Sequence, residues 1–174
     1  MTRPAPDFAP SPDRTWDLRR AFGCFGTGVT VVTVMTERGP IGMTANSFSS
    51  VSLDPPLVLW SPAISSRRHD AFADATDFCI HVLRAEQLDL ATHFATNGEG
   101  FETFGWVPGP GGAPTLAGCL AEFHCQTHAL HPAGDHSVIL GRVCHVRQAT
   151  DTGPGLLFER GRFGAFAPAP DPAT

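Results

Sequence analysis

Glycine and proline interrupt this chain at short intervals, and their spacing limits the fold more than any other feature of the sequence. Among 174 residues there are 18 glycines and 16 prolines, residue types that end helices and form turns. The runs between them are short and rich in β-branched residues, as in residues 29–36 and 77–83, which favours strands. Helical patterns are expected only over residues 13–25, 66–75 and 85–96. Because strands do not alternate with long helices, the sequence predicts a mainly β fold, an antiparallel barrel with a few peripheral helices.

The remaining elements follow from the same signals. Further strands are expected at residues 41–47, 57–60, 119–130, 137–146 and 156–158, with a serine-rich stretch at 48–53 and a long loop at 98–112. Since no linker divides the chain, we expect one domain over residues 15–166. The ends are rich in proline and polar residues, which predicts a disordered arm at residues 1–14 and a flexible tail at residues 167–174.

Composition argues against several classes of function. The formal net charge is −5, which gives no electrostatic support for nucleic-acid binding. No apolar run approaches the roughly 20 residues of a membrane-spanning helix, and the first residues lack the apolar region of a signal peptide. The five cysteines are scattered and form no C-x-x-C pair. They are expected to be small apolar residues in strands, without disulfides or zinc, which favours a cytoplasmic location.

The sequence does not predict a metal site or a separate nucleotide-binding domain. His124, His128 and His131 lie near Cys125, but four residues along a strand span roughly 13 Å, too far for two side chains to share one metal ion. We therefore expect structural or surface histidines and no metal. No G-x-G-x-x-G sequence follows a strand, so a separate Rossmann domain for a nicotinamide nucleotide is not expected.

Residues 44–52, TANSFSSVS, form the segment richest in short polar side chains. Six of the nine residues carry a hydroxyl or an amide, groups that are poor core material unless paired but present donors well to an anion or a heteroaromatic edge. A flavin nucleotide has both features, and Arg67 and Arg68 follow as candidate partners for its phosphate. On composition alone, a serine-rich surface turn is the more ordinary explanation.

The longer run over residues 42–58, G-x-T-A-N-S-F-S-S-V-S-L-D-P-P-L-V, closely resembles a segment of the short-chain flavin reductase family. Further similarities follow in the family's order at residues 25–33, 78–87, 101–106, 114–119, 134–136 and 141–143. Together they cover about residues 16–166. The family comprises the reductase components of two-component flavin monooxygenases, and the resemblance implies their FMN-binding split β-barrel fold.

The same resemblance implies a function and a set of site residues. The function is an NAD(P)H-dependent flavin reductase that transfers hydride from NADH or NADPH to FMN or FAD and supplies reduced flavin to a partner monooxygenase, as a homodimer. The implied cofactor-binding residues are Thr27, Gly28, Val29, Thr44, Ala45, Asn46, Ser47, Ser49, Ser50, Ser52, Ser61, Ser65, Arg67, His81 and Phe163. Of these, Phe163 is implied to lie near the nicotinamide and the others near the flavin. His136 is implied as the catalytic-site residue, beside the flavin face where the nicotinamide stacks. A histidine that satisfies backbone groups of a turn is the ordinary alternative for His136.

Two positions depart from the family pattern. His81 stands where relatives often carry asparagine, so a contact there would alter flavin affinity or potential. Trp60 precedes Ser61 and is bulky enough to narrow the pocket. Both departures keep open a rival function, a flavin-binding electron-transfer protein of the same fold without reductase turnover. A third possibility, a barrel that acts only as an interaction module, leaves the polar segment unexplained.

Overall fold

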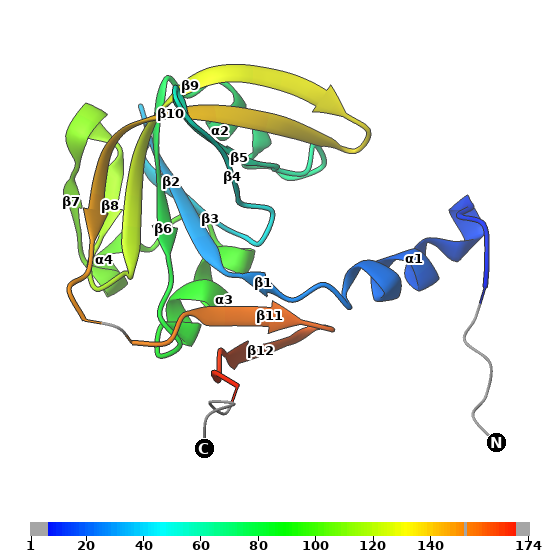
Figure 1. The fold of residues 1–174 in the computed structure, drawn as a ribbon. Coiled ribbons are helices and arrows are strands. Elements are labelled where there is room, and N and C mark those ends of the chain that lie inside the picture. The colour runs from blue at the N-terminus through cyan, green and yellow to red at the C-terminus, as the bar shows by residue number, and fades with distance from the viewer. Residues whose placement is uncertain (1–6, 152, 170–174) are drawn as a thin grey trace.

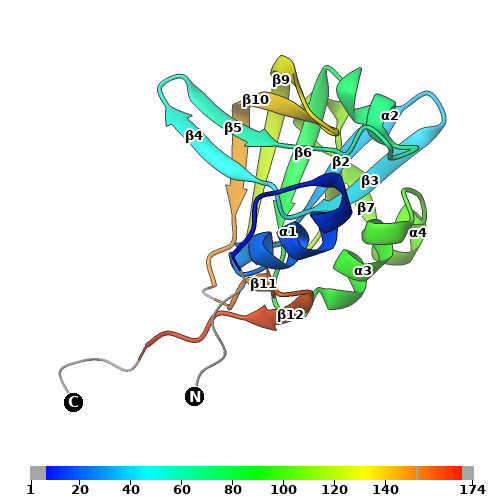
Figure 2. The same cartoon turned by 90° about the vertical axis from the view of Figure 1, so that its right-hand side faces the viewer.

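The computed structural model describes residues 7–151 and 153–169, and its largest element is a curved sheet of seven strands (Figure 1). The strand order is β3-β2-β6-β9-β10-β5-β4, and neighbouring strands pair antiparallel. Their bounds are β2 (Thr30–Thr36), β3 (Gly39–Ala45), β4 (Ser49–Leu53), β5 (Pro56–Trp60), β6 (Asp77–Val82), β9 (Ala121–Ala133) and β10 (His136–Gln148). The β9–β10 pair extends beyond the rest of the sheet in Figure 1, and the β4–β5 pair does so in Figure 2. The antiparallel, mainly β prediction is confirmed.

Two smaller sheets complete the fold. One contains β1 (Thr27–Gly28), β11 (Leu156–Glu159) and β12 (Arg162–Ala165), and the other contains β7 (Trp106–Pro108) and β8 (Pro114–Leu116). The sequence predicts only β11 among these strands. β1, β7 and β8 have two or three residues each, too few to show a period. The segment expected as a long loop holds α4 (Phe101–Phe104), β7 and the 3-10 turn η2 (Pro110–Gly112).

The helices are shorter than their sequence patterns suggest. They are the 3-10 turn η1 (Pro12–Arg14), α1 (Thr15–Phe22), α2 (His69–Ala73) and α3 (Leu88–Thr96). α3 packs against β2 and β3, whereas α1 projects from the body and its Trp16 is 72% exposed (Figure 1). The apolar stripe that predicts α1 is therefore not buried against the core of its own chain. Residues 1–6 of the predicted arm and residues 170–174 of the predicted tail lie outside the described residues.

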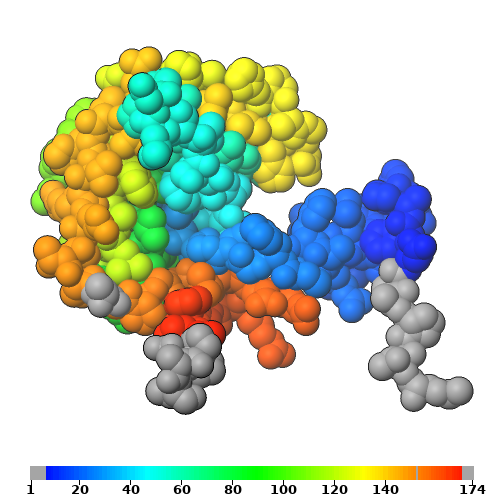
Figure 3. Space-filling model, in the orientation of Figure 1, coloured from blue at the N-terminus to red at the C-terminus, as the bar shows by residue number. Residues whose placement is uncertain are grey.

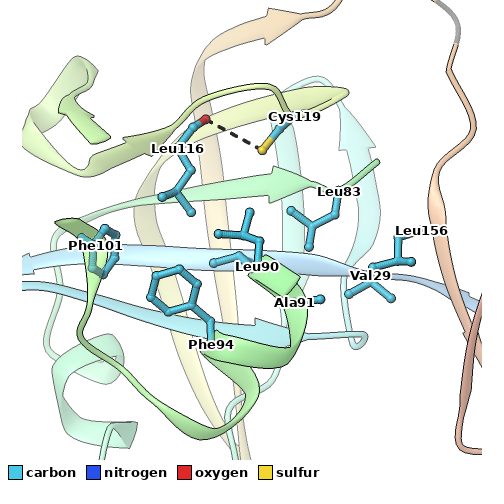
Figure 4. Close-up of a cluster of buried hydrophobic side chains, with 10 residues drawn as sticks. Val29, Leu83, Leu90, Ala91, Phe94, Phe101, Leu116, Cys119 and Leu156 are labelled. Atoms are coloured by element: carbon cyan, nitrogen blue, oxygen red, sulfur yellow. Dashed lines mark hydrogen bonds between the residues drawn. The ribbon is translucent and has the colours of Figure 1, made fainter. Parts of the chain in front are cut away.

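Strand alternation divides the buried side chains into two clusters. Phe78 and Ile80 of β6 belong to one cluster, and Cys79 and His81 point to the opposite face of the strand. The other cluster contains Leu90, Phe94, Phe101 and Leu116, and it joins α3 and α4 to β2 and β8 (Figure 4). Aromatic rings that bury about 150–250 Å² each dominate the stability of such clusters. The long strands and α3 therefore form one rigid scaffold.

Trp60 lies inside the first cluster and not at a pocket. Its ring meets Phe72 edge-on at a centroid distance of 5.1 Å, and the residue is fully buried. The expectation that Trp60 narrows a surface pocket is therefore wrong. The physical reason is strand alternation, which turns Trp60 toward the core at the end of β5.

The structure shows the state of the cysteines and the length of the helices. All five cysteines are free thiols, and Cys79, Cys119 and Cys125 are buried. Burial raises the pKa of Cys119 and of Cys125 to about 12, so these thiols stay protonated and behave as small apolar residues. Among the described residues, no helix is both long and apolar enough to cross a membrane.

Candidate functional site

A groove of about 1150 Å³ opens between α1, the turn after β11 and the start of β10 (Figure 3). In Figure 3 it is the hollow between the blue N-terminal segment and the yellow end of the β9–β10 pair. Thr27, Asn46 and His136 line it, and Phe158 of β11 contributes an aromatic wall. Three residues predicted from distant parts of the sequence therefore meet at one surface.

Hydrogen bonds fasten the segments that border the groove to one another. The Ser61 backbone N–H donates to Ser47 Oγ at 2.9 Å, and Ser47 Oγ donates to the Ser61 carbonyl at 3.3 Å. Ala63 forms a single antiparallel bridge with His136. As a result, Ser47 of the polar segment 44–52 and the start of β10 both lie beside the loop of residues 61–67.

His136 presents a partly open imidazole to this surface. Its side chain is 43% exposed, and Nδ1 lies 2.7 Å from Asp135 Oδ1. That hydrogen bond is the main cause that lowers the pKa of Asp135, and the positive charge of Arg19 on α1 adds to it. Within the described part of the chain, Nε2 of His136 has no hydrogen-bond partner, so it is free to meet a ligand in the groove.

Arginines concentrate around the same groove although the chain is acidic overall. The sequence has no lysine, and Arg19, Arg20 and Arg160 line the groove. Arg160 has φ of 49°, and its backbone N–H donates to the Gly23 carbonyl at 2.7 Å, which ties the β11–β12 turn to the end of α1. Guanidinium groups bind phosphate oxygens in a bidentate manner. No local sequence signal points to these arginines or to Phe158, because the groove joins segments more than 100 residues apart.

The other residues of the polar segment are placed beside the groove with different roles. Thr44 Oγ1 donates to the Ala91 carbonyl at 2.7 Å, so this hydroxyl holds α3 to β3, and only the Thr44 backbone is left for a ligand. Ala45 follows at the end of β3 and is half-buried. Ser49, Ser50 and Ser52 lie on the edge strand β4, the first two exposed and the third half-buried.

The two neighbouring arginines predicted as phosphate partners differ sharply. Arg68 donates from Nη1 and Nη2 to the carbonyls of Gly42, Phe94, Ala95 and Asn97 at 2.8–3.1 Å. Its guanidinium is therefore committed to the backbone at the end of α3. Arg67 and Ser65 are exposed on the loop that follows Ser61. Arg67 is the cation of this pair that remains available to a phosphate.

His81 is separated from the groove by its burial. The residue is fully buried on β6, where the Leu116 backbone N–H donates to Nε2 at 3.1 Å and Nδ1 donates to the Val31 carbonyl at 3.0 Å. Burial lowers the pKa of His81 to about 4, so the ring is neutral. Because both nitrogens are occupied inside the protein, we leave His81 out of the proposed flavin surface.

The remaining predicted residues lie around β1 and β12. Thr27 and Gly28 form β1, and the side chain of Val29 is buried in the cluster of Figure 4. Phe163 of β12 packs its ring 5.0 Å from that of Phe158 but is not among the residues that line the groove. The surface thus combines an aromatic wall, short polar side chains and cations, which fits a flavin nucleotide with its flat ring and phosphate.

Comparison with known proteins gives the same result. Residues 22–167 match the family described as "Flavin reductase like domain". The chain is 52% identical over 160 residues to "FMN reductase (NADH) SmoA" of Agrobacterium fabrum, covering 92% of this chain and 91% of that protein. It is 44% identical over 160 residues to "NADH-dependent FAD reductase" of Streptomyces globisporus, covering 88% of this chain and 87% of that protein.

Solved structures of similar proteins share the fold. The NADH:FAD oxidoreductase SgcE6 of Streptomyces globisporus superposes with a TM-score of 0.87 at 42% identity, over 99% of both chains. BorF, the flavin reductase component of a bacterial two-component tryptophan halogenase, superposes with a TM-score of 0.81 at 37% identity, over 89% of this chain and 99% of the other. The predicted fold and family are both confirmed: the chain belongs to the flavin reductase-like domain family.

Proposed function

We propose that this chain is an NADH-dependent flavin reductase that reduces FMN or FAD and supplies the reduced flavin to a partner monooxygenase. The observation that carries the proposal is the groove, where Asn46 and His136 face three arginines beside the Ser47–Ser61 pair. Relatives named FMN reductase (NADH) and NADH-dependent FAD reductase align with most of the chain, which favours NADH as the donor.

In this proposal the flavin lies along the end of β3. Thr44 and Ala45 contribute backbone groups, and Asn46 and Ser47 contribute donors to the edge of the isoalloxazine ring. The additional flavin contacts are assigned to Thr27, Gly28, Ser49, Ser50 and Ser52. Ser61, Ser65 and Arg67 hold the phosphate. Donors fixed in advance by the scaffold favour the negative charge of a reduced flavin without reorganising.

The chemistry requires little from protein side chains. When both are bound, the nicotinamide and the flavin supply the hydride-transfer chemistry. The chain binds the two rings, orients them and excludes water from the face they share. His136 orients the nicotinamide carboxamide through Nε2, since its Nδ1 is held by Asp135. Phe158 forms the apolar wall of the groove, and Phe163 packs against it.

The reductase is favoured over a flavin-binding electron-transfer protein of the same fold. Several similar proteins are named as reductases, among them the reductase component of a trigonelline monooxygenase of Acinetobacter baylyi, whose length this chain covers to 49%. An open groove with an exposed histidine also suits a nicotinamide that enters and leaves, whereas a permanent electron carrier needs only one bound cofactor.

The assembly and the location are also proposed. A homodimer is supported by the exposed apolar residues of α1, which have no partner within the described part of their own chain. A cytoplasmic location is supported by five free cysteines, because a reducing compartment keeps thiols unpaired.

The function is tested by mixing the purified protein with NADH and excess FMN or FAD and following the nicotinamide absorbance band. We expect multiple turnovers with at least one of the two flavins, and slower oxidation of NADPH than of NADH. Tightly bound flavin without turnover would favour the electron-transfer protein instead. Absence of flavin binding in equilibrium dialysis would overturn both functions.

A further inference from the structure

A buried hydrogen-bonded pair lies next to the groove and has no part in the function proposed so far. His69 is the first residue of α2, and its side chain is 13% exposed. His69 Nε2 lies 2.9 Å from Ser137 Oγ, and Ser137 is only 4% exposed. On its other side, His69 Nδ1 lies 2.9 Å from Asp70 Oδ1. The ring thus bridges a solvent-facing carboxylate and a buried hydroxyl at the start of β10.

The hydrogen-bonding capacity of the three groups fixes the direction of each bond when the ring is neutral. An ionised carboxylate only accepts, so the proton of His69 is on Nδ1 and is donated to Asp70. Nε2 then accepts from the Ser137 hydroxyl. A buried hydroxyl left without a partner destabilises the folded protein by more than the net contribution of such a bond.

Ser137 directly follows His136, so a constraint on Ser137 acts on the histidine in the groove. Three backbone contacts already attach this turn of chain to the loop before α2. Ser137 N–H donates to the Pro62 carbonyl at 3.1 Å, Ile64 N–H donates to the Asp135 carbonyl at 2.9 Å, and Ala63 bridges His136. All three contacts are between backbone groups, and they join residues 62–64 to residues 135–137.

His69 connects the loop of residues 61–67 to the start of β10. Its own backbone N–H donates to the Ser66 carbonyl at 2.9 Å, which fixes it to the exposed loop that carries Ser65 and Arg67. Its ring reaches Ser137 on β10. The proposed phosphate-binding loop and the proposed nicotinamide-binding histidine are therefore linked by the His69 side chain.

We infer that His69 is a positioning residue for flavin reduction, acting through Ser137 to hold His136 at a fixed place relative to the loop of residues 61–67. The inference rests on the proposed function. An alternative in which Asp70, His69 and Ser137 form a nucleophilic serine site does not fit, because Ser137 is buried and its backbone N–H is donated to Pro62.

The first experiment does not depend on activity. Hydrogen–deuterium exchange is measured on the segment of residues 134–139 in wild type, His69→Leu, His69→Gln and His128→Leu. Losing the bond to Ser137 is expected to speed exchange of this segment about fivefold to tenfold in His69→Leu. His69→Gln keeps an acceptor near Nε2 and is expected to retain most of the protection. His128 is exposed on β9 and serves as the control. Unchanged exchange in His69→Leu would overturn the inference whether or not the protein is a reductase.

The second experiment is a double-mutant cycle on NADH oxidation with FMN. His69→Leu is expected to raise KM for NADH several-fold with a small change in KM for the flavin, and His69→Gln to restore it. In a His136→Ala background, His69→Leu is expected to have little further effect on KM for NADH, because the residue it positions is gone. Equal effects in both backgrounds would mean that His69 acts only on folding. A wild type without turnover would refute the proposed function, and the exchange measurement would then decide on His69 alone.

Discussion

Burial is the main cause of the low pKa of His81. The ring accepts one backbone hydrogen bond and donates another, and the pKa is lowered to about 4 from 6.5, chiefly by loss of solvation. The pKa of His124, on the neighbouring strand β9, is lowered for the same reason. Neutral histidines of this kind belong to the packing of the sheet, and they make the fold sensitive to acid.

The stability of the protein should therefore fall between pH 6.5 and pH 4. In this window the unfolded chain protonates His81 and the folded chain does not, so unfolding is favoured as the pH decreases. Between pH 7 and pH 5 the free energy of unfolding should drop by about 2 kcal/mol from this group alone. Urea titrations of wild type and His81→Asn measure it, and the variant should show a shallower pH dependence. The same slope in both proteins would contradict the assignment, and His128→Asn is the control for an exposed histidine.

Arg67 allows a test of the proposed phosphate site. Arg67 is exposed on the loop, so Arg67→Ala should raise KM for FMN about tenfold, the loss of one charge-assisted contact to phosphate. Riboflavin has no phosphate, and its KM should be unchanged by the same substitution. The comparison needs only the NADH oxidation assay. If both flavins are affected equally, Arg67 does not bind the phosphate.

At the scale of elements, the join between β3 and α3 depends on close contacts of the backbone. A Cβ added at Gly42 would lie 2.5 Å from Phe94 Cδ1, so only glycine fits this position of β3. The Gly42 N–H donates to the Gly98 carbonyl, and Arg68 joins the Gly42 carbonyl to the end of α3. The predicted flavin segment continues directly from this join, so its position depends on it.

Removing the Arg68 guanidinium should loosen that join. Arg68→Ala leaves four backbone carbonyls without their charged donor, and the free energy of unfolding should decrease by about 3 kcal/mol. Arg67→Ala is the matched control and should change it by less than about 0.5 kcal/mol. Chemical denaturation of both variants gives the comparison. Equal destabilisation would show that the contacts of Arg68 contribute nothing specific.

The elements differ in how far sequence could predict them, and the reason is physical. β2, β6 and α3 contain enough residues for a period to appear, and they lie close to the predicted ranges. β1, β7, β8 and β12 exist because a partner strand is present, which local sequence does not encode. At the site, Asn46 and His136 came from motifs, whereas Phe158 and Arg160 became visible only when distant segments were brought together. The burial of Trp60 and His81 could not be predicted, because strand parity alone does not say which face of a strand meets the core.

For the whole molecule, the most unusual feature is the exposed apolar surface near the N-terminal helix. Trp16, Phe22 and Phe25 are all largely exposed. Apolar patches of this kind are uncommon on monomers and mark interaction surfaces. α1 also forms one side of the groove. A second copy that covers α1 would therefore complete the wall of the site.

The protein should be a dimer in solution that depends on α1. Sedimentation equilibrium should give twice the mass of the chain, and the combined substitution Trp16→Ser and Phe22→Ser should give monomers because it removes about 2 kcal/mol of apolar burial for each side chain. Val107→Ser, on β7 at the opposite side of Figure 1, is the control for an exposed apolar residue. A monomeric wild type would exclude the dimer, and a dimeric double variant would place the interface elsewhere.

The hydrogen bond between Arg160 and Gly23 attaches α1 to the turn between β11 and β12. The helix is attached to the body near its C-terminal end, and Trp16 lies seven residues before that pivot. At 1.5 Å per residue the arm is about 10 Å long, so a rotation of about 20° about the pivot displaces Trp16 by about 4 Å. Because α1 forms one side of the groove, its angle at this bond is one of the quantities that fix the width of the groove.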